Sequence, residues 1–184
     1  MNVYDFDKTI YDGDSTTDFI LWCIRKKPDL ALSIFPGAFA FGGYLLKLCQ
    51  KTYFKEKLYR ILARIPNIES WVEDFWDVHI YRIKDWYFIR QEKDDLIISA
   101  SPEFLVLPAC RRLHIEHLMA SRVDKTTGMY LGLNCHGEEK VRRFRKVYPD
   151  GVIDEFYSDS LSDAPLANLA KRAYLVKGDE LFPW

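Results

Sequence analysis

The chain has no strong excess of charge of either sign and no clustered cysteines. Its 26 Lys and Arg residues nearly balance 27 Asp and Glu residues, leaving a formal net charge of -1 at pH 7. A polyanionic partner such as nucleic acid is therefore not favoured. The four cysteines form no CxxC pair. Such spacing is typical of reduced thiols in a cytosolic protein, and it indicates neither a disulfide framework nor a zinc site.

The sequence also lacks a secretory signal and an uninterrupted membrane span. The N-terminus has neither a basic start nor an apolar run, so export is not expected. The uncharged segment 30–46 is shorter than the ~20 residues that cross a bilayer, and it contains Pro36 and Gly37. We interpret it as buried helices that meet at this break, with a membrane-touching hairpin as the alternative. A cytoplasmic protein is expected, with peripheral membrane contact through residues 30–46 as the second possibility.

What the sequence does contain is enough apolar surface for a core. Hydrophobic residues make up 48% of 184 positions, which fits one domain with a small appendage. Short apolar runs that end in polar residues predict buried parallel strands, and these lie at residues 2–4, 96–98, 156–157 and 174–176. Apolar residues at three- and four-residue spacing predict a long amphipathic helix over residues 67–87, with Asn67 as its cap. Further helices are expected at residues 103–113, 138–147 and 165–171, with a turn at 125–128.

The spacing of the strands indicates an insertion. About eighty residues with helical patterning separate the first two expected strands, whereas a βαβ unit needs only ~30. We therefore predict an α/β fold, with a doubly wound (Rossmann-like) parallel sheet core and an inserted helical cap. The expected core comprises residues 1–13 and 88–184, and the expected cap comprises residues 14–87.

Acidic residues follow the first strand and a later one. Asp5 and Asp7 are two apart, so both side chains face one reaction centre if the strand continues. Asp159 and Asp163 follow another apolar run, and sites in open α/β sheets lie at such strand ends. Crowded carboxylates need a cation, and carboxylate and phosphate oxygens suit Mg²⁺. These four residues are therefore the expected metal ligands.

A second set of residues suits an anion. Ser99 ends the run at 96–98, where its hydroxyl and the amides of Ala100 and Ser101 can hold phosphate oxygens. Lys140, on the helix after Gly137, can neutralise both a carboxylate and a phosphate. Together with the carboxylates, these groups indicate phosphoryl transfer.

The four motifs resemble those of the haloacid dehalogenase (HAD) superfamily in order and type. They are Asp5-Phe-Asp-Lys-Thr9, Ser99, Gly137-Glu-Glu-Lys140 and Ser158-Asp-Ser-Leu-Ser-Asp163. The place of the insertion and the form Ser-Ala-Ser-Pro-Glu of the second motif resemble the phosphoserine-phosphatase-like branch with a helical cap.

The resemblance implies a Mg²⁺-dependent phosphatase that forms an aspartyl-phosphate. Asp5 would be the nucleophile and Asp7 the general acid/base, with Ser99 and Lys140 completing the catalytic set. Metal ligation would come from Asp5, the Asp7 carbonyl and Asp159, while Asp163 would ligate through water or fix Lys140. Phosphate and substrate binding would involve Thr9, Ser99, Ala100, Ser101, Lys140 and Asp14.

The substrate is left open between two classes. Phosphoserine phosphatases have a Glu that reads the substrate amine where this chain has Asp14, which counts against phosphoserine itself. A small soluble, phosphoserine-like phosphomonoester is one class. The uncharged segment after Arg25-Lys-Lys-Pro28 is similar to the cap of bacterial phosphatidylglycerophosphate phosphatases, so a phospholipid head group is the other. A non-enzymatic phospho-aspartate signalling module also uses an acidic cluster with Ser and Lys. Asp7 and the cap favour turnover over this third interpretation.

Overall fold

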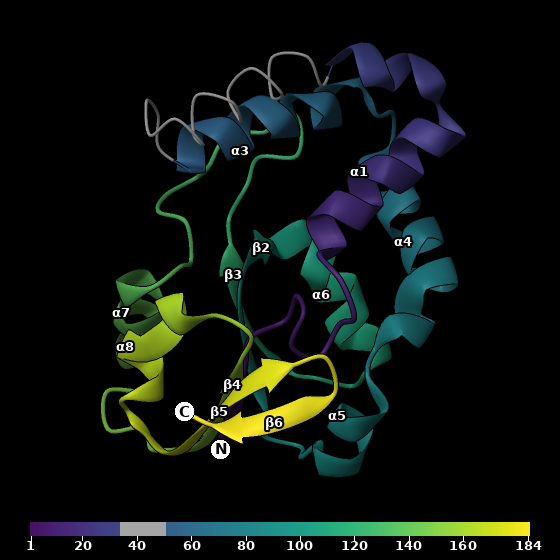
Figure 1. Cartoon of the computed structure of the whole chain (residues 1–184). Coiled ribbons are helices and arrows are strands. Elements are labelled where there is room, and N and C mark those ends of the chain that lie inside the picture. The colour runs from purple at the N-terminus through teal and green to yellow at the C-terminus, as the bar shows by residue number, and fades with distance from the viewer. Residues whose placement is uncertain (34–50) are drawn as a thin grey trace.

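One mixed sheet forms the centre of the molecule (Figure 1). The computed structural model describes residues 1–33 and 51–184, with side chains described from residue 55 onward in the second range. Within these residues, six strands lie in the order β3-β2-β1-β4-β5-β6. All pairs among β1 to β5 are parallel, and the pair of β5 with β6 at the edge of the sheet is antiparallel. The predicted doubly wound α/β fold is confirmed.

The strands are β1 (Asn2–Tyr4), β2 (Leu96–Pro102), β3 (His117–Ser121), β4 (Ile153–Ser158), β5 (Ala170–Lys177) and β6 (Glu180–Pro183). The α-helices are α1 (Ser15–Lys26), α3 (Lys51–Tyr59), α4 (Ile68–His79), α5 (Asp85–Arg90), α6 (Glu103–Arg112), α7 (Glu138–Val147) and α8 (Ala164–Ala167). Outside residues 34–50, four short 3₁₀ helices join them: η1 (Pro28–Ser33), η2 (Arg60–Arg64), η3 (Ile80–Arg82) and η4 (Leu161–Asp163).

Apolar layers cover both faces of the sheet. Successive strand residues point to opposite faces, so Val3 packs in one buried cluster and Tyr4 in the other. The Val3 cluster includes Phe144 of α7, and the Tyr4 cluster includes Leu105 of α6 and Trp76 of α4. Figure 1 accordingly shows α7 and α8 on one side of the sheet and α6 on the other. Burial on both faces explains why the central strands are continuous apolar runs.

The single long helix predicted over residues 67–87 is wrong. The chain forms α4, breaks through η3, and resumes as α5. At the break the backbone binds the loop after β1: Asp12 N–H donates to the Arg82 carbonyl at 2.8 Å, and Lys84 N–H donates to the Ile10 carbonyl at 2.8 Å. These tertiary hydrogen bonds replace helical ones at the break. The three- and four-residue spacing of apolar residues continues through it, although the helix does not.

The C-terminal region also differs from expectation. The helix expected at 165–171 ends early, because β5 already begins at Ala170. A hairpin at Gly178, with φ of 59°, then adds β6, a strand beyond those that the sequence predicts. The Trp184 amide donates to the Ala173 carbonyl at 2.9 Å and fixes the chain end beside β5.

The expected cap is described only in part. Residues 34–50 lie outside the described residues, so most of the segment 30–46, interpreted as buried helices or a membrane-touching hairpin, lies there too. In the part of the chain that the structure describes, no helix is both long and apolar enough to cross a membrane. The division at residues 14 and 87 stays a prediction.

A buried carboxylate outside the pocket offers a test of the fold. Asp95, only 1% exposed, precedes β2. One of its oxygens accepts from the Glu92 amide at 3.0 Å, and the other has no hydrogen bond among the described residues. Burial raises the pKa of Asp95 to about 6. Because the folded-state pKa lies above the unfolded value, protonation favours the folded state. Asp95 therefore costs stability above pH 6, and that cost shrinks as the pH falls and disappears below the unfolded pKa of 3.8.

Asp95→Asn is expected to raise the free energy of unfolding at pH 8 by up to ~3 kcal/mol, the equivalent of about two pKa units. The gain should vanish by about pH 3, where the wild-type carboxyl is largely neutral in both states because the pH lies below the unfolded pKa of 3.8. Urea unfolding at several pH values measures this. Asp94→Asn removes an exposed neighbouring carboxylate and serves as the control. An Asp95→Asn gain that does not change with pH would contradict the assignment.

Candidate active site

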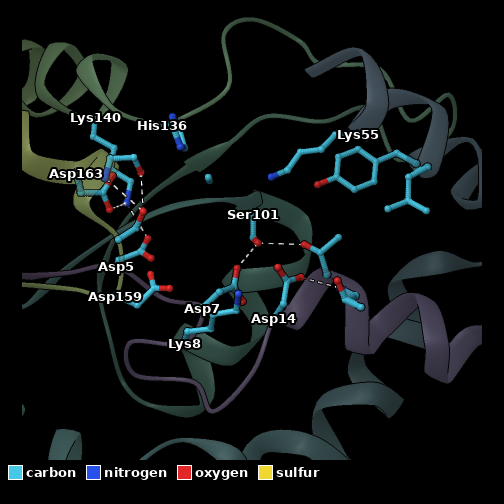
Figure 2. Close-up of a pocket in the computed structure, with 17 residues that line it drawn as sticks. Asp5, Asp7, Lys8, Asp14, Lys55, Ser101, His136, Lys140, Asp159 and Asp163 are labelled. Atoms are coloured by element: carbon cyan, nitrogen blue, oxygen red, sulfur yellow. Dashed lines mark hydrogen bonds and ion pairs between the residues drawn. The ribbon is translucent and has the colours of Figure 1, made fainter. Parts of the chain in front are cut away.

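The carboxyl ends of β1, β2 and β4 open onto one pocket of about 310 Å³. Figure 2 shows side chains from these strand ends converging on it from one side and α3 closing the other. Eight of the residues expected to form the site line this pocket: Asp5, Asp7, Asp14, Ala100, Ser101, Lys140, Asp159 and Asp163. The structure therefore brings together residues up to 158 positions apart in the sequence.

Lys140 joins two of the carboxylates. Its ammonium donates to Asp5 Oδ1 and to Asp163 Oδ2, each at 2.7 Å, and the side chain is only 2% exposed. Asp163 Oδ2 also accepts from the Ser158 hydroxyl at 2.8 Å. Asp5 follows β1 directly, and its amide donates to the Tyr157 carbonyl at 2.9 Å. The position of the Asp5 carboxylate is thus fixed by the sheet and by a buried ion pair.

Burial and charge oppose each other in this pair. Desolvation alone would lower the pKa of Lys140, but the carboxylates of Asp5 and Asp163 outweigh it and raise that pKa. Burial raises the pKa of Asp5, with the charge of Lys140 opposing the rise and that of Asp163 adding to it. Lys140 is therefore a permanent cation, beside carboxylates that are short of compensating positive charge.

Asp7 lies in a different environment. Its Oδ1 accepts from the Ser15 amide at the start of α1 at 2.7 Å, and its Oδ2 accepts a short hydrogen bond from the Ser101 hydroxyl. Thr16 Oγ1 lies 3.0 Å from Ser101 Oγ. Burial, followed by the charge of Asp14, raises the pKa of Asp7, although these hydrogen bonds lower it. A carboxyl with a raised pKa and hydroxyl neighbours suits proton transfer.

Asp14 has a structural role as well as a place in the pocket. It is the N-cap of α1, and its Oδ1 accepts from the Thr17 amide at 2.8 Å. This hydrogen bond satisfies one of the amides left open at a helix start. Its expected part in substrate recognition stays a prediction.

Two expected phosphate ligands do not line the pocket. The Ser99 side chain is buried, and its hydroxyl accepts from the Ser101 amide at 3.1 Å. Thr9 is also buried, and its hydroxyl accepts from the Asp159 amide at 3.0 Å. Each hydroxyl therefore orients a neighbouring segment of the site. Direct contact of Ser99 and Thr9 with phosphate stays a prediction.

The carboxylates fit a hard divalent cation. Burial raises the pKa of Asp159, as it does for Asp5 and Asp7, so a cation beside these carboxylates would stabilise their ionised forms. Asp163 Oδ1 is buried without a hydrogen bond among the described residues. Oxygen ligands crowded in this way are the donor set that Mg²⁺ takes.

A separate acidic group lies away from the pocket. Carboxylates of Glu92, Asp94 and Asp95 lie within 4.8 Å of one another. Asp94 is exposed and faces the N-terminal ammonium at 3.6 Å. This group precedes β2, at the end of the sheet opposite the strand ends that carry Asp5, and we assign no metal to it.

Sequence reasoning missed several residues that line the pocket. Lys8 lies inside the first motif and has a left-handed backbone, with φ of 57°. His136 directly precedes the third motif, and Thr16 follows the cap residue of α1. Lys8 and His136 could have been found from their place beside the motifs. Lys55 and Tyr59 of α3 gave no such signal, because only the tertiary fold brings α3 over the strand ends.

Comparisons with known proteins agree with this geometry. A sequence model described as haloacid dehalogenase-like hydrolase matches residues 3–168. A Mycobacterium tuberculosis protein named as a probable phosphatase is 34% identical over 94 residues, which make up 47% of this chain and 33% of that protein. The match thus spans about a third of the length of that relative.

Solved structures show the same fold. A protein of unknown function from Bordetella pertussis superposes with a TM-score of 0.69 at 20% identity, covering 94% of this chain and 87% of that chain. A phosphoserine phosphatase solved as a phospho-aspartyl intermediate analogue gives a TM-score of 0.57 at 15% identity, covering 93% and 83%. The match over residues 3–168 includes all four motifs, and the chain belongs to the haloacid dehalogenase-like hydrolase family.

Proposed function

We propose that the chain is a Mg²⁺-dependent phosphomonoester hydrolase that forms an aspartyl-phosphate on Asp5. The observation that carries the proposal is the unequal setting of two carboxylates on one pocket. Asp5 is fixed by the ammonium of Lys140, whereas Asp7 is held by a backbone amide and a hydroxyl. Two neighbouring acids with different partners suit two different roles.

In the first step, an Asp5 oxygen forms a bond to phosphorus while the bond from phosphorus to the leaving oxygen breaks. Protonated Asp7 gives its proton to that oxygen. In the second step, Asp7 takes a proton from water, and the resulting hydroxide attacks phosphorus. The bond from phosphorus to Asp5 then breaks, which releases inorganic phosphate and restores the free carboxylate.

Lys140 and the Ala100 and Ser101 segment would bind the transferring oxygens, because they line the same pocket as Asp5. Asp5, Asp159 and Asp163, with the Asp7 carbonyl, would hold Mg²⁺. When bound, the ion supplies positive charge that neutralises the phosphoryl oxygens.

We propose a small soluble phosphomonoester as the substrate class. Support comes from the solved phosphoserine phosphatase with the same fold. A phospholipid head group stays the alternative, because the segment 30–46 that suggested it lies largely outside the described residues. The phospho-aspartate switch is less consistent with the site, since Asp7 beside Asp5 provides a general base for turnover.

Hydrolysis of para-nitrophenyl phosphate tests the metal requirement. We expect turnover with Mg²⁺, loss of turnover in excess EDTA, and recovery when Mg²⁺ is restored, because the buried carboxylates repel the phosphate unless a cation is bound. EDTA saturated with Mg²⁺ beforehand is the matched control, and released nitrophenol is the measurement. Unchanged turnover in excess EDTA would show that the reaction needs no divalent ion.

A further inference from the structure

The pocket has a second wall whose chemistry differs from that of the strand ends. Across from the carboxylates, α3 contributes Lys55, Leu58 and Tyr59 to the lining. Figure 2 shows the Lys55 side chain extending from α3 into the pocket, toward the side where Ser101 and His136 lie. A cation on this wall is on the far side of the pocket from Lys140, whose ammonium is held between two carboxylates.

Tyr59 adds a hydrogen-bond donor to the same wall. It lies one helical turn after Lys55, and residues four apart share one face of a helix. Its side chain is 1% exposed, and its hydroxyl, which lies near Tyr130 and Thr16, makes no hydrogen bond of ordinary geometry among the described residues. Burial, followed by the nearby Tyr130, raises the pKa of Tyr59, so the hydroxyl keeps its proton. Buried hydroxyls without a partner are uncommon, and one beside a pocket suits a ligand.

We infer that Lys55 and Tyr59 form a subsite for a second anionic group on the leaving group of the substrate. The inference rests on the proposed function, in which the phosphoryl group lies against Asp5 and Lys140. A leaving group attached to that phosphorus must extend away from the strand ends, and α3 forms the wall on that side. An ammonium with a neutral hydroxyl recognises a carboxylate or a phosphodiester.

The subsite narrows the substrate class in a way that the strand-end residues do not. Alcohol phosphates without a further charge would bind through the phosphoryl group alone. Phosphomonoesters with a carboxylate or phosphodiester near the ester would gain a charge-assisted hydrogen bond. Both a soluble acid and an anionic lipid head group have this chemistry, so the experiment needs an arm for each.

Paired probes isolate the second anion. In the soluble arm, 3-phosphoglycerate is compared with glycerol 3-phosphate, which replaces the carboxylate by a hydroxymethyl group. In the lipid arm, short-chain phosphatidylglycerophosphate is compared with short-chain phosphatidic acid, which lacks the phosphodiester between its phosphomonoester and the rest of the lipid. Dissociation constants are measured by calorimetry with Mg²⁺ in the Asp5→Asn background, where turnover does not interfere.

Lys55→Met is expected to weaken binding of the anion-bearing member of at least one pair by about tenfold or more, as loss of a charge-assisted hydrogen bond does. Binding of the other member of that pair should change less than twofold, because it lacks the second anion that Lys55 would contact. Tyr59→Phe should act in the same direction with a smaller effect, and Lys55→Arg should retain most of the preference. Lys57→Met makes the same charge change on the same helix at a residue that does not line the pocket.

The result shows which anion the subsite takes. Selective weakening for 3-phosphoglycerate supports a carboxylate, and selective weakening for the lipid supports a phosphodiester. Equal weakening of both members of each pair, or no weakening in either pair, would overturn the subsite. These binding measurements do not depend on turnover. Absence of turnover by the chain with Asp5 intact would overturn the proposed function instead.

Discussion

Asp5→Asn is expected to abolish phosphomonoester hydrolysis, lowering the rate by roughly 10⁴-fold or more, as removal of a covalent nucleophile does in other hydrolases. The amide has nearly the shape of the carboxylate, but its oxygen is far less nucleophilic, so the bond to phosphorus does not form. Steady-state release of nitrophenol measures the loss.

The variant should still fold. Lys140 keeps its 2.7 Å contact with Asp163, and the oxygen of Asn can accept the second hydrogen bond. A small shift in the thermal midpoint is therefore expected. Asp12→Asn is the matched control, because Asp12 is an exposed carboxylate in the same loop and does not line the pocket. Wild-type turnover by Asp5→Asn would rule out Asp5 as the nucleophile.

Trapping the intermediate gives an independent measurement. Wild-type protein quenched in acid during turnover should carry one phosphoryl group on the peptide that contains Asp5, since acyl phosphates survive acid better than base. The Asp5→Asn protein should carry none. A phosphoryl group on another residue would show that the nucleophile is not Asp5.

Much of the fold was predictable because strands that are buried on both faces of the sheet are continuous apolar runs in the sequence. The strands around Val3, Ile97 and Phe156 are apolar runs, since neither face meets water. Helices α6 and α7 were also expected near their observed bounds. Each of these elements is defined by local apolar patterning, which the sequence displays directly.

The break between α4 and α5 was not predictable in this way. Its cause is a pair of hydrogen bonds to the loop after β1, formed by the Arg82 carbonyl and the Lys84 amide. Backbone contacts of this kind depend on a distant segment and have no side-chain signature. The β6 strand has the same origin, because it is only four residues long and lies at the edge of the sheet, where it pairs with β5 alone.

The carboxylates and Lys140 could be placed in one site because the ends of parallel strands meet at one edge of a sheet. The hydrogen bonds inside that site were less accessible. Sequence position suggested that the Ser101 amide binds phosphate, whereas the structure adds a hydroxyl contact to Asp7. The rotamer of Ser101 and the register shift of β2 between Ser99 and Pro102 decide this contact, and neither can be read from residue type.

Asp7→Asn is expected to lower kcat by about 10²- to 10⁴-fold, the usual contribution of general acid–base catalysis. The Asn oxygen can accept from the Ser15 amide, and its NH₂ group can donate to Ser101 Oγ. The pocket should therefore keep its shape. What the variant loses is a group that both releases and takes up a proton.

The two chemical steps should respond unequally. Para-nitrophenolate leaves readily without a proton, so formation of the aspartyl-phosphate should be slowed less than its hydrolysis, which needs a base to deprotonate water. Asp7→Asn should then show a rapid burst of nitrophenol, approaching one equivalent per protein chain, before slow turnover. With an alkyl phosphate, the released alcohol should show no burst, since the leaving alkoxide needs the proton that Asp7 would have supplied.

The Ser101 hydroxyl explains why Asp7 can serve both steps. A hydroxyl donates to an ionised carboxylate and accepts from a protonated one, so Ser101, backed by Thr16 at 3.0 Å, can support either state of Asp7. Rapid-quench measurement of the burst, with Asp12→Asn as control, checks this division of labour. Full steady-state activity of Asp7→Asn would remove Asp7 from both proton transfers, and the unequal settings of the two carboxylates would then need another explanation.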